Sequence, residues 1–125
     1  MLFRSPDHAH RALRLAKRIR QSGMEVTARW SDAELRLGVG VGVASGFVTV
    51  GVIGAASRLE YAAVGPAVNL AARLCSEAAP GEVLIDQRTM ELLGAEQVRS
   101  ELRPGEALQL KGFQQPVQSY TLAAA

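Results

Sequence analysis

The stretch Leu37-Gly-Val-Gly-Val-Gly-Val-Ala-Ser-Gly46 decides how this chain of 125 residues folds. From Leu35 to Val43, apolar side chains alternate strictly with Arg36 and three glycines. A period of two is typical of a β-strand, and a glycine face lets another element approach the strand closely. A second β-rich run, from Phe47 to Ile53, follows the turn residues Ala44-Ser-Gly46. We therefore expect the two runs to form a hairpin.

Two other interpretations of this stretch are rejected. Residues 37–57 carry no charge and are long enough to cross a membrane, with glycines at the small-xxx-small spacing of paired membrane helices. The strict alternation and the six glycines disfavour a helix, so we expect no membrane segment. The glycines also match neither the Rossmann nor the Walker spacing, and a phosphate-binding loop is not expected there.

Composition indicates a globular chain. Hydrophobic residues make up 48% and charged residues 21%, which argues against disorder. The single cysteine, Cys75, excludes an internal disulfide and a multi-cysteine zinc site, and we expect it to be a buried helix residue. Trp30 and Tyr61 are expected to pack in the interior. The first residues lack the apolar run of a secretory signal, so a cytoplasmic location is expected.

The remaining patterns predict an α+β domain with helices covering one sheet. Helices are expected from Ser5-Pro6-Asp7 to Gly23, from Gly65-Pro66 to about Ala78, and from a capping Asp86 to Gly94. Strands are expected at Val83–Ile85, Glu106–Lys111 and Val117–Leu122, and Ala123–Ala125 is expected to fray.

Basic residues gather in the first third of the chain. Residues 1–36 hold eight basic and four acidic side chains, a balance that would suit a nucleic-acid-binding protein. No aromatic side chains are interleaved with these arginines to stack on bases. We therefore favour a solvated helix face and expect no nucleic-acid partner.

One pair of side chains could carry chemistry. Asn69 and Arg73 lie four residues apart, so they share a face of the second helix, away from Leu70 and Leu74. A guanidinium matches phosphate oxygens, and a carboxamide one turn away can hold a sugar or reacting oxygen. Such pairs are also common on solvated helices, and the spacing alone leaves both interpretations open.

The wider context resembles the catalytic domain of class III adenylate and guanylate cyclases. The similarity rests on Leu37–Gly46, on Val50-Gly-Val-Ile-Gly54 and on Arg58-Leu-Glu-Tyr-Ala-Ala-Val-Gly-Pro-Ala-Val-Asn-Leu-Ala-Ala-Arg-Leu74. Pro80-Gly-Glu-Val-Leu-Ile85 and Leu110-Lys-Gly-Phe-Gln-Gln-Pro-Val117 resemble that family's closing segments. The match runs in order over residues 2–122. It implies a ferredoxin-like cyclase fold with an antiparallel-rich sheet, here as a partial domain over residues 1–125.

The resemblance implies a reaction and roles for four residues. Members of the family make a cyclic nucleotide and pyrophosphate from ATP or GTP, in sites built between two subunits, as a homodimer or with a cyclase partner. Asn69 would orient the ribose and Arg73 would neutralise phosphate charge, both as catalytic residues. Lys111 would contact the triphosphate, and Ala62 stands where the family has a purine-reading residue.

The resemblance also implies Mg²⁺ or Mn²⁺ as cofactor. The family's first third, with both metal-binding aspartates, has no counterpart here, and Asp7, Asp32 and Asp86 lie in none of its contexts. We therefore expect no metal ligands in this chain and little activity from it alone. The same expectation fits a non-catalytic module that pairs with a complete cyclase. The family's first strand would lie beside residues 35–43, so we also expect an open apolar edge, and a chain that alone is marginally stable, domain-swapped or self-associated.

Overall fold

The architecture comes from a computed structural model, which describes residues 6–30, 32, 37–94 and 99–122. The described part contains the helices α1 (His8–Ala28), α2 (Pro66–Glu77) and α3 (Gln87–Leu92). Its strands are β1 (Val41–Val43), β2 (Thr49–Ala55), β3 (Arg58–Val64), β4 (Val83–Asp86), β5 (Leu102–Leu108) and β6 (Val117–Leu122). The expected α+β class is confirmed.

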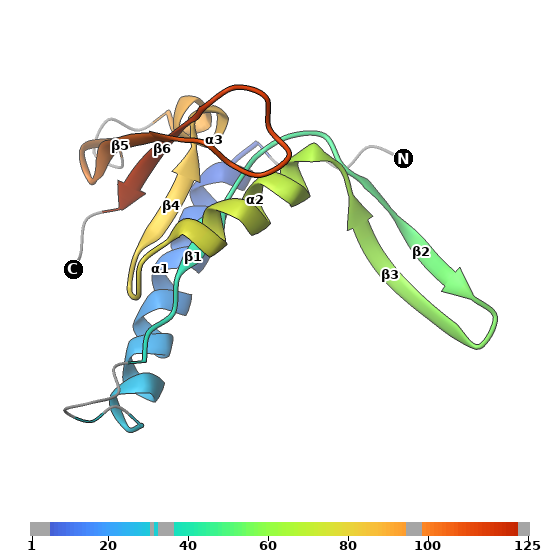
Figure 1. Cartoon of the computed structure of the whole chain (residues 1–125), viewed down its shortest axis with the longest axis horizontal. Helices are drawn as coiled ribbons and strands as arrows, with labels where there is room; N and C mark the ends of the chain where they lie inside the picture. The colour runs from blue at the N-terminus through green and yellow to red at the C-terminus, as the bar shows by residue number, and fades with distance from the viewer. Residues whose placement is uncertain (1–5, 31, 33–36, 95–98, 123–125) are drawn as a thin grey trace.

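The main sheet has the strand order β1-β4-β6-β5 (Figure 1). β1 and β4 are parallel, whereas β4–β6 and β5–β6 are antiparallel. β1 is an edge strand of this sheet, as expected from the sequence. β4 lies inside the sheet, and all four of its residues are buried because helices cover both faces there.

The core is divided by the sheet. Val83 and Ile85 of β4 pack with Ala9 and Leu13 of α1 on one face. Leu84, between them in sequence, packs with Leu74 of α2 and with Leu110 on the other face. Successive strand residues point to opposite faces, so this short strand holds a helix on each side of the sheet.

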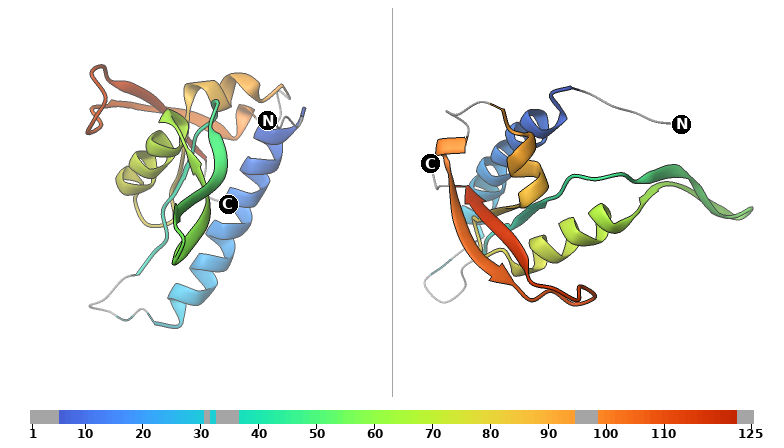
Figure 2. Two further views of the ribbon diagram at one scale, coloured as in Figure 1. Left: turned by 90° about the vertical axis from the view of Figure 1, so that its right-hand side faces the viewer. Right: turned by 90° about the horizontal axis from the view of Figure 1, so that it is seen from above.

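The strands β2 and β3 form a separate two-stranded ribbon that extends away from the main sheet (Figure 2). Their register pairs Thr49 with Val64 and Ala55 with Arg58. The expected hairpin between residues 35–43 and 47–53 is therefore wrong. β1 pairs with β4 instead, and β2 pairs with β3, a strand that sequence reasoning overlooked although Leu59, Tyr61 and Ala63 alternate along it.

The first helix differs from its prediction at its C-terminal end. α1 continues through Gly23 to Ala28, where Gly23 had been expected to end it. A Cβ at Gly23 would lie 2.9 Å from Cγ2 of Val39, so a glycine at this position lets Val39 pack closely against α1. Asp7 occupies the N-cap position and accepts the backbone bond from Arg11 at 3.0 Å, whereas Ser5 lies outside the described residues.

The strand expected from Leu35 is shorter than predicted, because β1 covers only Val41–Val43 and residues 37–40 are not part of a strand. Most of the other boundaries agree with the sequence. The bounds of α2, β4 and β6, and Asp86 as the cap of α3, confirm the expectations to within about a residue. β5 begins at Leu102, four residues earlier than expected, and ends before Lys111. A register irregularity between Pro104 and Ala107 interrupts β5, so its first half lacks the regular alternation that predicts a strand. Ala123–Ala125 and Leu35–Arg36 lie outside the described residues.

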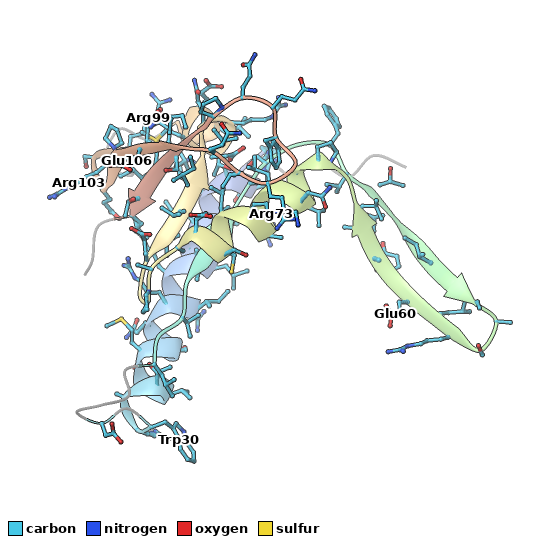
Figure 3. All side chains as sticks on the ribbon, viewed as in Figure 1. Trp30, Glu60, Arg73, Arg99, Arg103 and Glu106 are labelled. Carbon is cyan, nitrogen blue, oxygen red and sulfur yellow. The ribbon has the colours of Figure 1, made fainter. Side chains whose placement is uncertain are left out.

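Three expected interior residues are on the surface. Cys75 is exposed, and its Sγ lies 3.4 Å from the carbonyl oxygen of Gly40. Trp30 is 71% exposed near the far end of α1 (Figure 3). Tyr61 is 73% exposed on the ribbon. The prediction that these residues are buried is therefore wrong, because burial depends on whether another element covers a side chain and not on its apolar character alone.

Candidate functional site

The start of α2 positions the two residues singled out from the sequence. Gly65, with a φ of +157°, precedes the helix, and Pro66 opens it with no amide proton to satisfy. The amide of Asn69 donates to the carbonyl oxygen of Gly65 at 3.3 Å. Leu74 is fully buried beneath the helix, whereas Asn69 and Arg73 are exposed. The shared face predicted from their spacing is therefore present.

Lys111 reaches this face from the turn between β5 and β6. Leu110, only 3% exposed, packs against Leu74 and Leu84 and anchors the turn beside α2. The amide of Phe113 donates to the carbonyl oxygen of Leu110 at 3.1 Å, and Gly112 takes a φ of +90°. A β-carbon would strain that backbone, so the glycine shapes the turn that follows the lysine.

Asn69, Arg73 and Lys111 line one open cavity of about 500 Å³. Its other lining residues are Pro66, Ala72, Gly112 and Phe113. Arg73 extends from α2 beneath the β5–β6 turn (Figure 3). Among the described residues neither Arg73 nor Lys111 has an ion-pair partner, so the cavity carries two uncompensated positive charges. Such a cavity suits an anion with several oxygens, such as a polyphosphate.

Ala62 lies elsewhere. It stands on β3 opposite Gly51, in the outer ribbon. It lines a shallow hollow with Ile53 and Arg58, and not the cavity of Asn69. Within the described chain, three of the four expected site residues are thus brought together and Ala62 is not.

The described residues do not fit a metal centre. They include no group of three or more His, Cys, Asp and Glu side chains placed to hold an ion. Oδ1 of Asp86 instead caps α3, accepting from the amide and the hydroxyl of Thr89 at 3.1 and 2.5 Å. Within this part of the chain, the Mg²⁺ or Mn²⁺ implied by the resemblance has no set of oxygen ligands.

Sequence reasoning missed the cavity wall formed by Gly112 and Phe113. The signal was available, because both directly follow Lys111 in a segment already recognised as similar to the cyclase family.

In the part of the chain that has been described, no helix combines the length and the apolar character needed to cross a membrane.

Comparison with known proteins finds similar sequences in mycobacteria. An uncharacterized protein of Mycobacterium tuberculosis (strain CDC 1551 / Oshkosh) is 40% identical over 81 residues, which are 63% of this chain and 14% of that protein. A second, from Mycobacterium bovis, is 39% identical over 80 residues, 62% of this chain and 15% of the relative. The chain thus spans about a seventh of the length of these curated relatives.

Solved structures extend the similarity over nearly the whole chain. The guanylate cyclase domain of RhGC from Catenaria anguillulae, in complex with GTP, is similar with a TM-score of 0.72 and 28% identity. That match covers 96% of this chain and 62% of the other. The adenylyl cyclase CyaB from P. aeruginosa is 36% identical with a TM-score of 0.59, over 67% of this chain and 41% of that one.

The family assignment rests on the full length of the match together with the fold. Residues 2–124 match the family described as the adenylate and guanylate cyclase catalytic domain. The structural neighbours over 96% of the chain are cyclase domains of ferredoxin-like fold. The chain therefore belongs to the adenylate and guanylate cyclase catalytic domain family.

Proposed function

We propose that this chain supplies the phosphate- and ribose-binding part of a nucleotide cyclase site, which makes cyclic AMP or cyclic GMP for signal transduction. The observation that carries the proposal is the convergence of Asn69, Arg73 and Lys111 on one open cavity. Two cations and a carboxamide suit a nucleoside triphosphate better than a small monoanion, because the charges are spread along the cavity wall.

Each side chain has a distinct task in the proposed reaction. The 3′-oxygen of the ribose forms a bond to the α-phosphorus and loses its proton to water, while the bond from that phosphorus to the bridging oxygen breaks and pyrophosphate leaves with the electron pair. Arg73 stabilises the charge that develops on the phosphoryl oxygens. Asn69 orients the ribose for in-line attack, and Lys111 holds the triphosphate chain.

This chain alone is not expected to be an active cyclase. The described residues hold no acidic cluster that could bind the two cations expected for the family. We expect the isolated chain to bind nucleotide weakly and to produce no cyclic nucleotide.

A second protein chain completes the site in this proposal, and the β2–β3 ribbon supports that view. One face of the ribbon carries Val50, Val52, Leu59, Tyr61 and Ala63, all of them exposed. A two-stranded ribbon is marginally stable in water, and its apolar face gains stability when it is covered. We propose a second copy, or another cyclase chain, as the cover.

Nucleotide binding tests the proposed site. Fluorescent analogues of ATP and GTP should bind the chain, and Arg73→Ala or Lys111→Ala should each weaken binding about tenfold or more, the usual loss of a charged hydrogen bond. Arg88→Ala removes an exposed cation from α3 and serves as the matched control. Equal binding by all three variants would contradict the proposal.

The alternative is a non-catalytic partner that regulates a complete cyclase. The absence of an acidic cluster among the described residues fits this function equally well. Mixing the chain with a cyclase disabled at its own Asn or Arg position separates the two. Recovery of cyclic nucleotide supports a contributed site, and no recovery at excess chain favours the regulatory module.

A further inference from the structure

A chain of hydrogen bonds joins the root of the β2–β3 ribbon to the core. Ser45 lies in the linker between β1 and β2, and its hydroxyl is 2.7 Å from the hydroxyl of Thr89 in α3. Thr89 is fully buried, and its hydroxyl is 2.5 Å from Oδ1 of Asp86. Asp86 is 5% exposed at the end of β4.

The direction of these bonds follows from counting protons. A hydroxyl group carries one proton and can donate it once. Thr89 donates its proton to the carboxyl oxygen of Asp86, so the bond between the two hydroxyl groups must be donated by Ser45. Ser45 is thus the outer end of a directed series that finishes on a buried acceptor. Such a series has one geometry that satisfies every member, so it holds the linker in place.

Close backbone contacts continue from this linker to α2. A Cβ at Gly46 would lie 3.0 Å from Cβ of Ala67, in the first turn of α2. A Cβ at Gly65 would lie 3.0 Å from the carbonyl oxygen of Phe47. The two segments that connect the ribbon to the rest of the fold therefore lie close together at the start of α2. Ser45 directly precedes the first of these segments.

We propose that Ser45 is a positioning residue that sets the direction of the β2–β3 ribbon relative to the main sheet. It acts through Thr89 and Asp86, which anchor it to the buried end of β4. Its hydrogen bond fixes the incoming linker, and the contacts of Gly46 and Gly65 pass that constraint to the ribbon and to the first turn of α2. Without the Ser45 hydroxyl, the ribbon stays attached but takes a wider range of orientations relative to the main sheet.

Spin-label distances test this directly. In a Cys75→Ser background, Ser57→Cys labels the exposed turn of the ribbon and Arg14→Cys labels the exposed side of α1. Dilution with unlabelled chain removes distances between molecules. The parent should give one narrow distribution, and Ser45→Ala and Thr89→Val should each widen it about twofold, as expected when a constrained segment gains freedom.

Two controls separate positioning from general stability. Thr89→Ser keeps the hydroxyl and should restore the narrow distribution. Ser119→Ala removes another buried hydroxyl, which donates to the carbonyl oxygen of Glu106 at 3.1 Å, and should leave the distribution narrow. Widths equal to the parent in both Ser45→Ala and Thr89→Val would overturn the inference, as would equal widening in Ser119→Ala. The measurement uses no nucleotide, so its result is independent of the cyclase proposal.

Discussion

A Cβ added to Gly42 would lie 2.3 Å from the carbonyl oxygen of Ala71, a backbone atom of α2. It would also lie 2.4 Å from the amide nitrogen of Cys75. Gly38 and Gly40 face Pro80 and Ala78 in the same way. The glycines of residues 38–42 thus allow close backbone packing. Helix α2, which carries Asn69 and Arg73, and the residues that follow it lie directly on β1 and on the segment before β1.

This contact predicts a large loss of stability for Gly42→Ala. The clashing atoms belong to helix backbone and cannot rotate away, so the free energy of unfolding should fall by more than about 3 kcal/mol, the upper end for overpacking. Urea denaturation measures it. Gly51→Ala is the control, because a Cβ there meets nothing within 4 Å. A loss below about 1 kcal/mol at Gly42 would show that α2 does not rest on β1 as described.

The anchor of Lys111 gives a second prediction. Leu110→Ala should lower the free energy of unfolding by about 2–5 kcal/mol, because it empties a site against Leu74 and Leu84. It should also weaken nucleotide binding at temperatures where the variant stays folded, since the turn that carries Lys111 loses its anchor. Leu92→Ala, at a residue 40% exposed on α3, should do neither. Unchanged binding in a folded Leu110→Ala chain would contradict this account of the turn.

The ribbon predicts self-association. Tyr61→Asp places a charge on the apolar face and should shift the chain toward the monomer in analytical ultracentrifugation. Ala55→Asp places the same charge on the opposite face and should leave association unchanged. A parent chain that is already a stable monomer, or equal behaviour of the two variants, would contradict a second copy of this chain as the cover of this face.

Salt dependence follows from the exposed charges of the cavity. Arg73 and Lys111 lie at an open surface, where salt screens attraction to a polyphosphate. Raising the salt concentration should therefore weaken triphosphate binding more than monophosphate binding, as titrations at several salt concentrations would show. Binding that does not depend on salt would indicate that the nucleotide lies away from these cations.

Local patterns predicted most of the helices and strands, but not how the strands pair. The alternation around Val41 and Val43 correctly predicted a strand with a glycine face. Its partner, β4, lies some 40 residues further along the chain, and only the packing of both helices on the sheet decides that pairing. The overlooked β3 had the correct alternation, but Arg58 and Glu60 obscured it among the apolar runs on either side.

The candidate site was also predictable only where it depends on local sequence. A spacing of four residues places Asn69 and Arg73 on one helix face whatever the rest of the fold does. The position of Lys111 depends on a turn held by Leu110 in the core, which no local pattern reveals. The family resemblance pointed to Lys111 and to Ala62, and the fold places Ala62 on the outer ribbon.

The most direct test of the central claim is a titration of the isotopically labelled chain with ATP and GTP, followed by amide chemical shifts. The account predicts that the largest changes fall on residues 66–73 and 111–113, at the walls of one cavity. Changes confined to other parts of the chain, or none at saturating nucleotide, would contradict the assignment of Asn69, Arg73 and Lys111 to a nucleotide site.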